Sequence, residues 1–410
     1  MAVVALPTAR VVDRLTNQCC SGYCLLGHLC DAVDALTAVP NARLLTSFLN
    51  GSWRRECPPL SLTPAEVARA APLLIGSGAA ALGWRRIKDT PALKGCAEAQ
   101  ELCQSGQILA LEEARLDGAL EFVATRLNEV GIVPLIAKGW AVAHFYSSRY
   151  LRAYGDFDLC APAGRYELAR ATLLRLTPTR SPGSDMDDIF VDCGPDLGVC
   201  TIDLHKNFDA TAYMPPVETL YARSTLAKAG SADIRLLAFE DHLRFVIMHL
   251  LKHGAWRPSG LCDVAAMVEA VPPDFDWDLC LGDDKVAAGW IGATIMLAHR
   301  LLGCRLDTTP PALRADPPAW FERAVLREWE APYAGRFRSI TASALAKNPG
   351  ELLHIFHWLR VRWPTPVAAL IEARSPVNTP LRLPDQVASL ARTVARGSAK
   401  YLSSTLQSLR

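Results

Sequence analysis

Two aspartates placed two positions apart in an apolar run constrain this 410-residue chain more than any other feature of its sequence. The run is RAYGDFDLCAP, and as a β-strand it would place Asp156 and Asp158 on one face. Phe157 and Leu159 would lie on the other face, where they can anchor the strand in a core. Two carboxylates this close raise each other's pKa unless a cation lies between them. The pattern therefore indicates a metal site, and a solvated strand end is the alternative.

A third carboxylate follows in a later apolar run, GVCTIDLHKNF, which contains Asp203. This run and the preceding one, DIFVDCG, are separated by residues 195–197 between glycines, and this spacing predicts a hairpin. If the second hairpin strand pairs beside the strand of Asp156 and Asp158, three carboxylates meet on one sheet face. Such a group suits two divalent cations that bridge phosphate oxygens, and magnesium prefers carboxylate oxygens and water.

A lysine–glycine pair precedes the acidic strand. In IVPLIAKG, Lys138 and Gly139 lie where a short predicted strand meets a small-residue helix, WAVAHFYSS. Free backbone N–H groups and the helix dipole attract phosphate at such a junction, and Lys138 would add a point charge. Arg152 would either hold a substrate phosphate or neutralise the acids. His205 would support the metal ligands or be a satisfied sheet residue, and the second interpretation is slightly favoured.

The predicted elements alternate between strand and helix only in the middle of the chain. Helical patterns fill the first hundred or so residues, and Thr63, Pro64 and Glu66 mark one helix start. Leucine and valine spacing predicts a further helix from about Ala99 to Asn128. The next elements read strand, helix, strand, helix, strand, strand, which predicts a small sheet.

The fold class that follows is α+β, with a small mixed β-sheet core and helical regions on both sides of it in the sequence. We expect an N-terminal helical region at 1–100, the core at 101–237 and a C-terminal helical domain at 238–410.

Composition excludes several classes of protein. Half of the residues are hydrophobic, 21% are charged and the formal net charge is +1, so no overall field selects nucleic acid or a membrane. The longest uncharged apolar stretch, Ala70 to Trp84, is shorter than the roughly 20 residues of a membrane span. The 13 cysteines are scattered and no secretory signal begins the sequence, which together predict a reducing cytoplasm.

Three further groups of residues have weaker patterns. The cysteine-rich stretch NQCCSGYCLLGHLC lacks paired Cys-x-x-Cys spacing, so buried thiols on a helix are favoured over a zinc site. His249 and His253 share a predicted helix face, with Asp263 downstream, and a hydrogen-bonded interdomain role is favoured over a metal site. The basic and apolar residues near the C-terminus predict a packed surface helix rather than one that binds membrane or RNA.

The stretch LIAKGWAVAHFYSSRYLRAYGDFDLCAP, followed by TIDLH, resembles the uncharacterised bacterial nucleotidyltransferase family of the DNA polymerase beta-like superfamily. The shared pattern is a Lys-Gly turn, a short helix, an arginine before Asp-x-Asp-Leu, and a later Asp-Leu-His. The resemblance implies metal ligands at Asp156, Asp158 and Asp203, and a phosphate-binding turn at Lys138 and Gly139. The chain lacks the Gly-Ser pair that the wider superfamily has at that turn.

The resemblance implies a magnesium-dependent enzyme, with two ions, that moves a nucleoside monophosphate from an NTP, by default ATP, to an acceptor hydroxyl or similar group. Asp156 and Asp158 would hold both ions, Asp203 would favour loss of the acceptor proton, and Arg152 would contact the nucleotide. The acceptor would be a small molecule, a natural-product peptide or a protein, since the resemblance implies that members often occur among specialised-metabolite genes. The alternative is a catalytically silent nucleotide-binding or interaction protein on the same fold.

Overall fold

The computed structural model describes residues 39–177, 188–208, 213–330 and 363–408, and for residues 396–408 it describes the backbone only. The predicted cysteine cluster at residues 19–30 lies outside these ranges. The nine cysteines inside them are free thiols. In the same ranges, no helix is both long enough and apolar enough to cross a bilayer.

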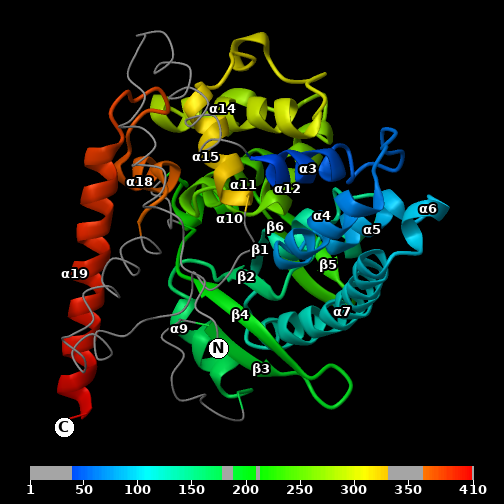
Figure 1. Ribbon diagram of the computed structural model, residues 1–410. Coiled ribbons are helices and arrows are strands. Elements are labelled where there is room, and N and C mark those ends of the chain that lie inside the picture. Colours follow the sequence, from blue (N-terminus) through cyan, green and yellow to red (C-terminus); the bar gives the residue numbers. More distant parts are fainter. Residues whose placement is uncertain (1–38, 178–187, 209–212, 331–362, 409–410) are drawn as a thin grey trace, which may run out of the picture. The chain divides into compact units, whose positions relative to one another are not determined.

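A mixed sheet of six strands, in the order β3-β4-β2-β1-β6-β5, confirms the predicted α+β class (Figure 1). β2 runs parallel to β4 and antiparallel to β1, while β6 runs parallel to β1. The edge strands β3 and β5 pair antiparallel with their neighbours. The strand bounds are β1 (Leu135–Ala137), β2 (Asp156–Cys160), β3 (Asp188–Asp192), β4 (Val199–His205), β5 (Thr225–Ala229) and β6 (Ala232–Leu236).

The hairpin of β5 and β6 is a part of the sheet that the sequence analysis missed. Its strands are joined by Gly230 and Ser231, and Gly230 has a φ of 57°. A glycine–serine pair between two short runs was the available signal. Leu226 of β5 is 61% exposed, so the apolar alternation typical of a half-buried strand is weak there.

Helices make up most of the described residues before and after the sheet (Figure 1). In α4, Thr63 and Glu66 form the predicted capping box, with the Thr63 N–H donating to the Glu66 carboxylate at 2.8 Å. The long helix predicted to begin near Ala99 begins at Ala97 and ends at Asn128, as predicted. The N-terminal helices are α3 (Pro40–Leu49), α4 (Pro64–Gly76), α5 (Ala80–Ile87), α6 (Pro91–Lys94) and α7 (Ala97–Asn128).

In the described part of the chain, four short helical segments lie between the strands, and further helices follow them. Those between the strands are α8 (Gly139–Ala143), η1 (Arg149–Leu151), α9 (Tyr166–Leu174) and α10 (Val217–Arg223). Those after the sheet are α11 (Phe239–Lys252), α12 (Pro258–Glu269), α13 (Trp277–Leu281), α14 (Lys285–Leu302), η2 (Pro311–Leu313), α15 (Ala319–Trp329), α18 (Pro366–Ala373) and α19 (Leu383–Ser408). Residues Asn41–Arg410 form one compact unit, and the three-part division at residues 100 and 237 remains a prediction.

The two faces of the sheet pack against different helices. Phe157 and Ile202 belong to a buried cluster that includes Leu120 of α7 and Leu173 of α9. On the opposite face, the alternation of β2 directs Cys160 into a second cluster. That cluster contains Leu220 of α10 and Phe245 of α11. Because Asp158 alternates with Phe157, it lies on the same face as Cys160, the face covered by α10 and α11.

Candidate active site

The register of the central strands brings the second and third aspartates together. β2 and β4 are paired in parallel, and the Cα atom of Asp158 lies opposite that of Asp203. Asp156 lies opposite Thr201, two residues earlier on the same strands. Directly opposite residues of a paired strand point to one face. The β4 strand therefore lies beside β2, which was the condition for three carboxylates to share a sheet face.

Asp158 is the buried member of the group. Only 3% of the residue is exposed. Its Oδ1 atom lies 2.5 Å from the Lys138 ammonium and 3.1 Å from Nε2 of His205. Burial alone would raise the pKa of Asp158, but the His205 hydrogen bond and the Lys138 charge outweigh it, so the pKa is lowered. Asp158 is therefore a carboxylate held in its ionised form by two cationic side chains.

His205 bridges the two opposite carboxylates. Its Nε2 atom lies 3.1 Å from Asp158 Oδ1 and 3.2 Å from Asp203 Oδ2. Burial disfavours protonation, yet the hydrogen bonds to both acids raise the pKa of His205 to about 9. The interpretation as a satisfied sheet residue missed this contact with both acids. The signal was present, because the period of two places His205 on the same face as Asp203.

Among the described residues, Asp158, Asp203 and His205 form the one group whose ligand atoms could hold a metal ion. One such atom from each lies within 4.8 Å of the others. The Asp203 side chain is 34% exposed, so the group can be reached from solvent. Two carboxylates at this separation offer the oxygen ligands that hard divalent cations prefer.

Asp156 stands apart from this three-residue group. The residue is exposed and forms no ion pair with any described residue. Neighbouring protein atoms, together with the charge of Asp158, raise the pKa of Asp156. Asp156 is thus an accessible carboxylate on the same sheet face, two residues before the buried one.

Lys138 and Gly139 form the turn between β1 and α8, as predicted, and the Lys138 ammonium points to the acids. The N–H group of Lys138 donates to Nε2 of His242 at 3.2 Å, so this backbone donor is not free for phosphate. A Cβ atom on Gly139 would lie 3.3 Å from Cβ of Tyr154, which explains why glycine fits this close approach. The nucleotide-binding role of the turn remains a prediction.

Arg152 has a different partner from those considered in the sequence. Its guanidinium lies 2.8 Å from Oδ2 of Asp263, and the Tyr146 hydroxyl donates to Oδ1 of Asp263 at 2.6 Å. Because Asp263 is buried in these contacts, it does not join His249 and His253 in a metal site. The two histidine rings instead contact each other at a tilt of 56°, with centroids 4.6 Å apart. A nucleotide-binding role for Arg152 remains a prediction.

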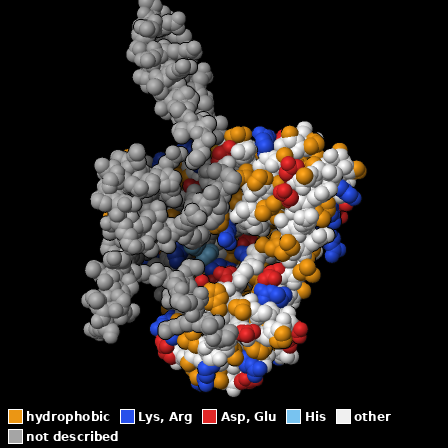
Figure 2. Space-filling model, turned by 60° about the horizontal axis from the view of Figure 1, so that its bottom comes forward, with side chains coloured by type: hydrophobic (Ala, Val, Ile, Leu, Met, Phe, Trp, Pro, Cys, Tyr) orange, Lys and Arg blue, Asp and Glu red, His pale blue; other side chains and the backbone are white. Residues whose placement is uncertain are grey.

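Acidic, basic and histidine side chains lie next to one another on the face of the molecule that Figure 2 shows. A surface on which both signs of charge meet is consistent with a site that binds an anion and a cation together.

Among the comparisons with known proteins, a family model is the finding that identifies a family. The model of a family described as "Uncharacterised nucleotidyltransferase" matches residues 64–300, which is more than half of the chain. No curated protein sequence matches the chain significantly. One solved structure, an antigenic nucleotidyltransferase-like protein from Paracoccidioides brasiliensis, is 16% identical, with a TM-score of 0.35. The match covers 49% of this chain and 93% of that chain.

Proposed function

The chain belongs to the uncharacterised nucleotidyltransferase family, and from this premise we propose that it moves a nucleoside monophosphate from an NTP to an acceptor, with a divalent metal. The observation that carries the proposal is the pairing of Asp158 with Asp203 on adjacent parallel strands, beside the Lys138 turn. The acceptor would present a hydroxyl or a similar group. Pyrophosphate would be the second product.

The residues of the site fit a hard divalent cation, and magnesium is the ion we propose. Asp158 and Asp203 would hold it, and Asp156 would add an accessible carboxylate for a second ion. When bound, such ions neutralise phosphate charge and lower the pKa of the attacking hydroxyl. Lys138 and His205 offset the charge of Asp158 and Asp203 in the structure, whereas Asp156 has no ion-pair partner among the described residues.

The side chains have distinct parts in the proposed reaction. The acceptor oxygen attacks the α-phosphorus, the bond from that phosphorus to the bridging oxygen breaks, and pyrophosphate leaves with the bonding electrons. Asp203, which is partly exposed, would accept the acceptor proton on its way to solvent. Lys138 would bind the β- or γ-phosphate, because its ammonium lies beside Asp158 on a turn that faces the acids.

ATP is the first nucleotide to test, and the acceptor we propose is a small molecule, a natural-product peptide or a protein. The decisive assay incubates the purified chain with each labelled NTP, magnesium and a cell extract. We expect release of pyrophosphate and transfer of the label in proportion to enzyme. Loss of both signals in Asp158→Asn, with both retained in Asp196→Asn at the exposed tip of the β3–β4 hairpin, would support the proposal. Equal turnover in all three proteins would refute it.

A further inference from the structure

The turn that carries Lys138 has a strained backbone. Lys138 has a φ of 50° and a ψ of −141°, a region that residues with a side chain rarely adopt. It is one of three non-glycine residues with positive φ in the described part of the chain. Such a conformation is unfavourable for a residue with a side chain and persists only where the surroundings favour it. The contacts of the turn must therefore include some that stabilise this conformation.

Two contacts seat the turn against the neighbouring elements. The carbonyl of Lys138 accepts the N–H of Val142 at 2.9 Å, which begins α8. A Cβ atom on Gly139 would lie 3.4 Å from the carbonyl oxygen of Asp156, so the turn packs closely against the start of β2. Neither contact involves the N–H group or the side chain of Lys138, so other groups must orient these two.

One face of α11 contacts both of those groups. His242, Phe245 and His249 follow one another at spacings of three and four, so they lie on one helix face. Nε2 of His242 accepts the Lys138 N–H at 3.2 Å. The Lys138 ammonium lies 5.6 Å from the centre of the Phe245 ring and 3.5 Å from Nε2 of His249. His242 therefore contacts the backbone of Lys138, and Phe245 and His249 contact its ammonium.

We propose that His242 is a positioning residue, which holds Lys138 in its positive-φ conformation and so aims the ammonium at Asp158 and at the nucleotide phosphates. The phosphate part rests on the proposed function, whereas the backbone part stands on geometry alone. His242 is 4% exposed. Burial and the nearby charge of Arg152 lower the pKa of His242 to about 4, so the imidazole is neutral. Its proton is on Nδ1, which leaves Nε2 as the acceptor.

The first test reads the hydrogen bond itself, by hydrogen–deuterium exchange of the Lys138 amide in the full chain. His242→Leu removes the acceptor at similar volume, while His242→Gln offers an oxygen at similar reach. We expect exchange to be about tenfold faster in the leucine variant, in line with the loss of one buried hydrogen bond, and near wild type in the glutamine variant. Unchanged protection in His242→Leu would overturn the proposal.

If His242→Leu does not fold, His242→Asn takes its place, because the asparagine oxygen is too short to reach the turn. The same acceleration is expected there, and retained protection would again overturn the proposal. His299→Leu is the matched control, since that imidazole contacts the carbonyl of Cys304 instead. Its Lys138 amide should exchange as in the wild type.

The second test asks whether His242 acts through Lys138. Calorimetry would measure the affinity for magnesium α,β-methylene-ATP in the wild type, His242→Leu, Lys138→Met and the double variant. We expect a five- to tenfold loss from His242→Leu alone, and no further loss when it is added to Lys138→Met. Additive losses would contradict a positioning role. If the wild type binds no nucleotide, the proposed function fails, and amide exchange still decides the backbone part.

Discussion

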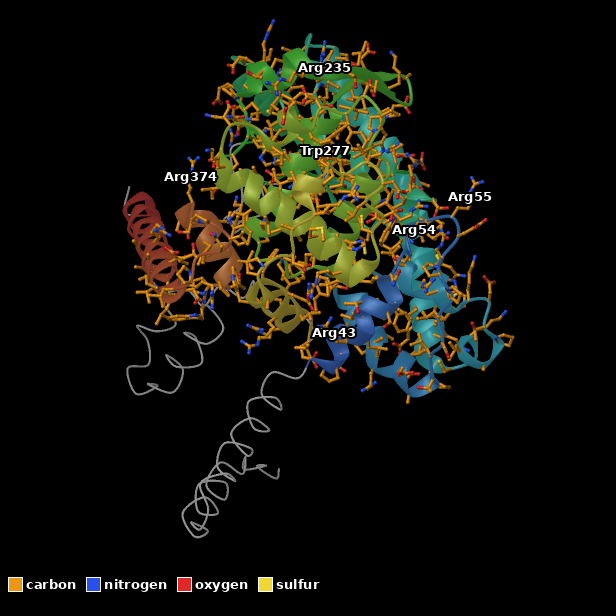
Figure 3. All side chains as sticks on the ribbon, turned by 90° about the horizontal axis from the view of Figure 1, so that it is seen from above. Arg43, Arg54, Arg55, Arg235, Trp277 and Arg374 are labelled. Carbon is orange, nitrogen blue, oxygen red and sulfur yellow. The ribbon has the colours of Figure 1, made fainter. Side chains whose placement is uncertain are left out.

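Two carboxylate clusters differ in how fully the protein surrounds their charge. Glu269, at the end of α12, has a side chain that is 6% exposed. It forms ion pairs with Arg54 and Arg305, accepts the Trp53 indole N–H at 3.2 Å, and accepts the Arg305 N–H at 2.8 Å. One carboxylate therefore has two guanidinium partners. Arg54, labelled in Figure 3, belongs to the N-terminal segment, so the cluster joins parts of the chain that are far apart in sequence.

The acids of the sheet are surrounded less completely. Asp158 and Asp203 share Lys138 and His205, while Asp156 has no ion-pair partner among the described residues. Here acids outnumber the cations that contact them, and two of the acids are accessible to solvent. We infer that a carboxylate enclosed by donors from distant segments stabilises the fold. Carboxylates that outnumber their cationic partners on one face of the sheet can instead bind an added cation.

The largest effect that separates the two clusters is expected on catalysis. Asp203→Asn removes a charge from a partly exposed residue whose ion pair is with His205. Activity should fall about a thousandfold, because metal-assisted phosphoryl chemistry depends on several kcal/mol of such stabilisation. The melting temperature in chelator should change little. Pyrophosphate release and melting curves check this, and a variant that is strongly destabilised yet active would reverse the comparison.

The next largest effect is expected on stability at the other cluster. Glu269→Gln leaves the largely buried Arg54 without its counter-charge, whereas the Arg305 side chain is 62% exposed and loses less. Breaking a buried pair in this way costs about 3–5 kcal/mol of unfolding free energy. Denaturant unfolding measures the loss, and nucleotide affinity of the folded variant should stay at the wild-type value. A large change in nucleotide affinity with normal stability would mean that Glu269 belongs to the functional site.

The pH dependence of the stability difference between the wild type and Glu269→Gln tests whether Glu269 has this structural role. Burial opposes ionisation of Glu269, but the hydrogen bonds from Arg54 and Arg305 outweigh it, so the pKa is lowered in the folded state. A lowered carboxylate pKa contributes stability that is complete above the unfolded value of about 4.3 and is lost as the pH falls through the folded value. The stability difference between wild type and Glu269→Gln should therefore be constant from neutral pH to about pH 5 and shrink below pH 4. A difference that grows on acidification contradicts the assignment.

The smallest effect concerns the strained turn. Glycine adopts positive φ without a steric cost, so Lys138→Gly should be more stable than Lys138→Ala by about 1 kcal/mol. Both variants lack the ammonium, so both lose the ion pair with Asp158, and this loss cancels when their unfolding free energies are compared. Denaturant unfolding of the two variants under the same conditions measures this difference in unfolding free energy. Equal stability would show that the turn stores no strain.

Local patterns in the sequence predicted the elements that local forces determine. The capping box of α4, the extent of α7 and the strands from β1 to β4 follow from cap residues and from periods of 3.6 and two. From the sequence, the pairing of β2 with β4 could only be assumed as a condition, and its parallel direction was not predicted, because strand pairing depends on the whole sheet. His205 could have been assigned from its period-two relation to Asp203.

Other contacts could not be predicted from periodicity. His242 meets Lys138 across 104 positions, and Arg152 meets Asp263 across 111. Arg54 and Glu269 are 215 positions apart. These residues come into contact because of how the helices pack onto the sheet. A local sequence pattern carries no information about that packing.

The central claim is that the paired acids of β2 and β4 bind a divalent cation, and Mn²⁺ binding followed by electron paramagnetic resonance tests it most directly. Mn²⁺ takes the same oxygen ligands as magnesium. We expect saturable binding by the wild type and by Asp196→Asn, and binding at least tenfold weaker in Asp158→Asn and Asp203→Asn, since each removes a ligand charge. Equal Mn²⁺ affinity in all four proteins would contradict the account.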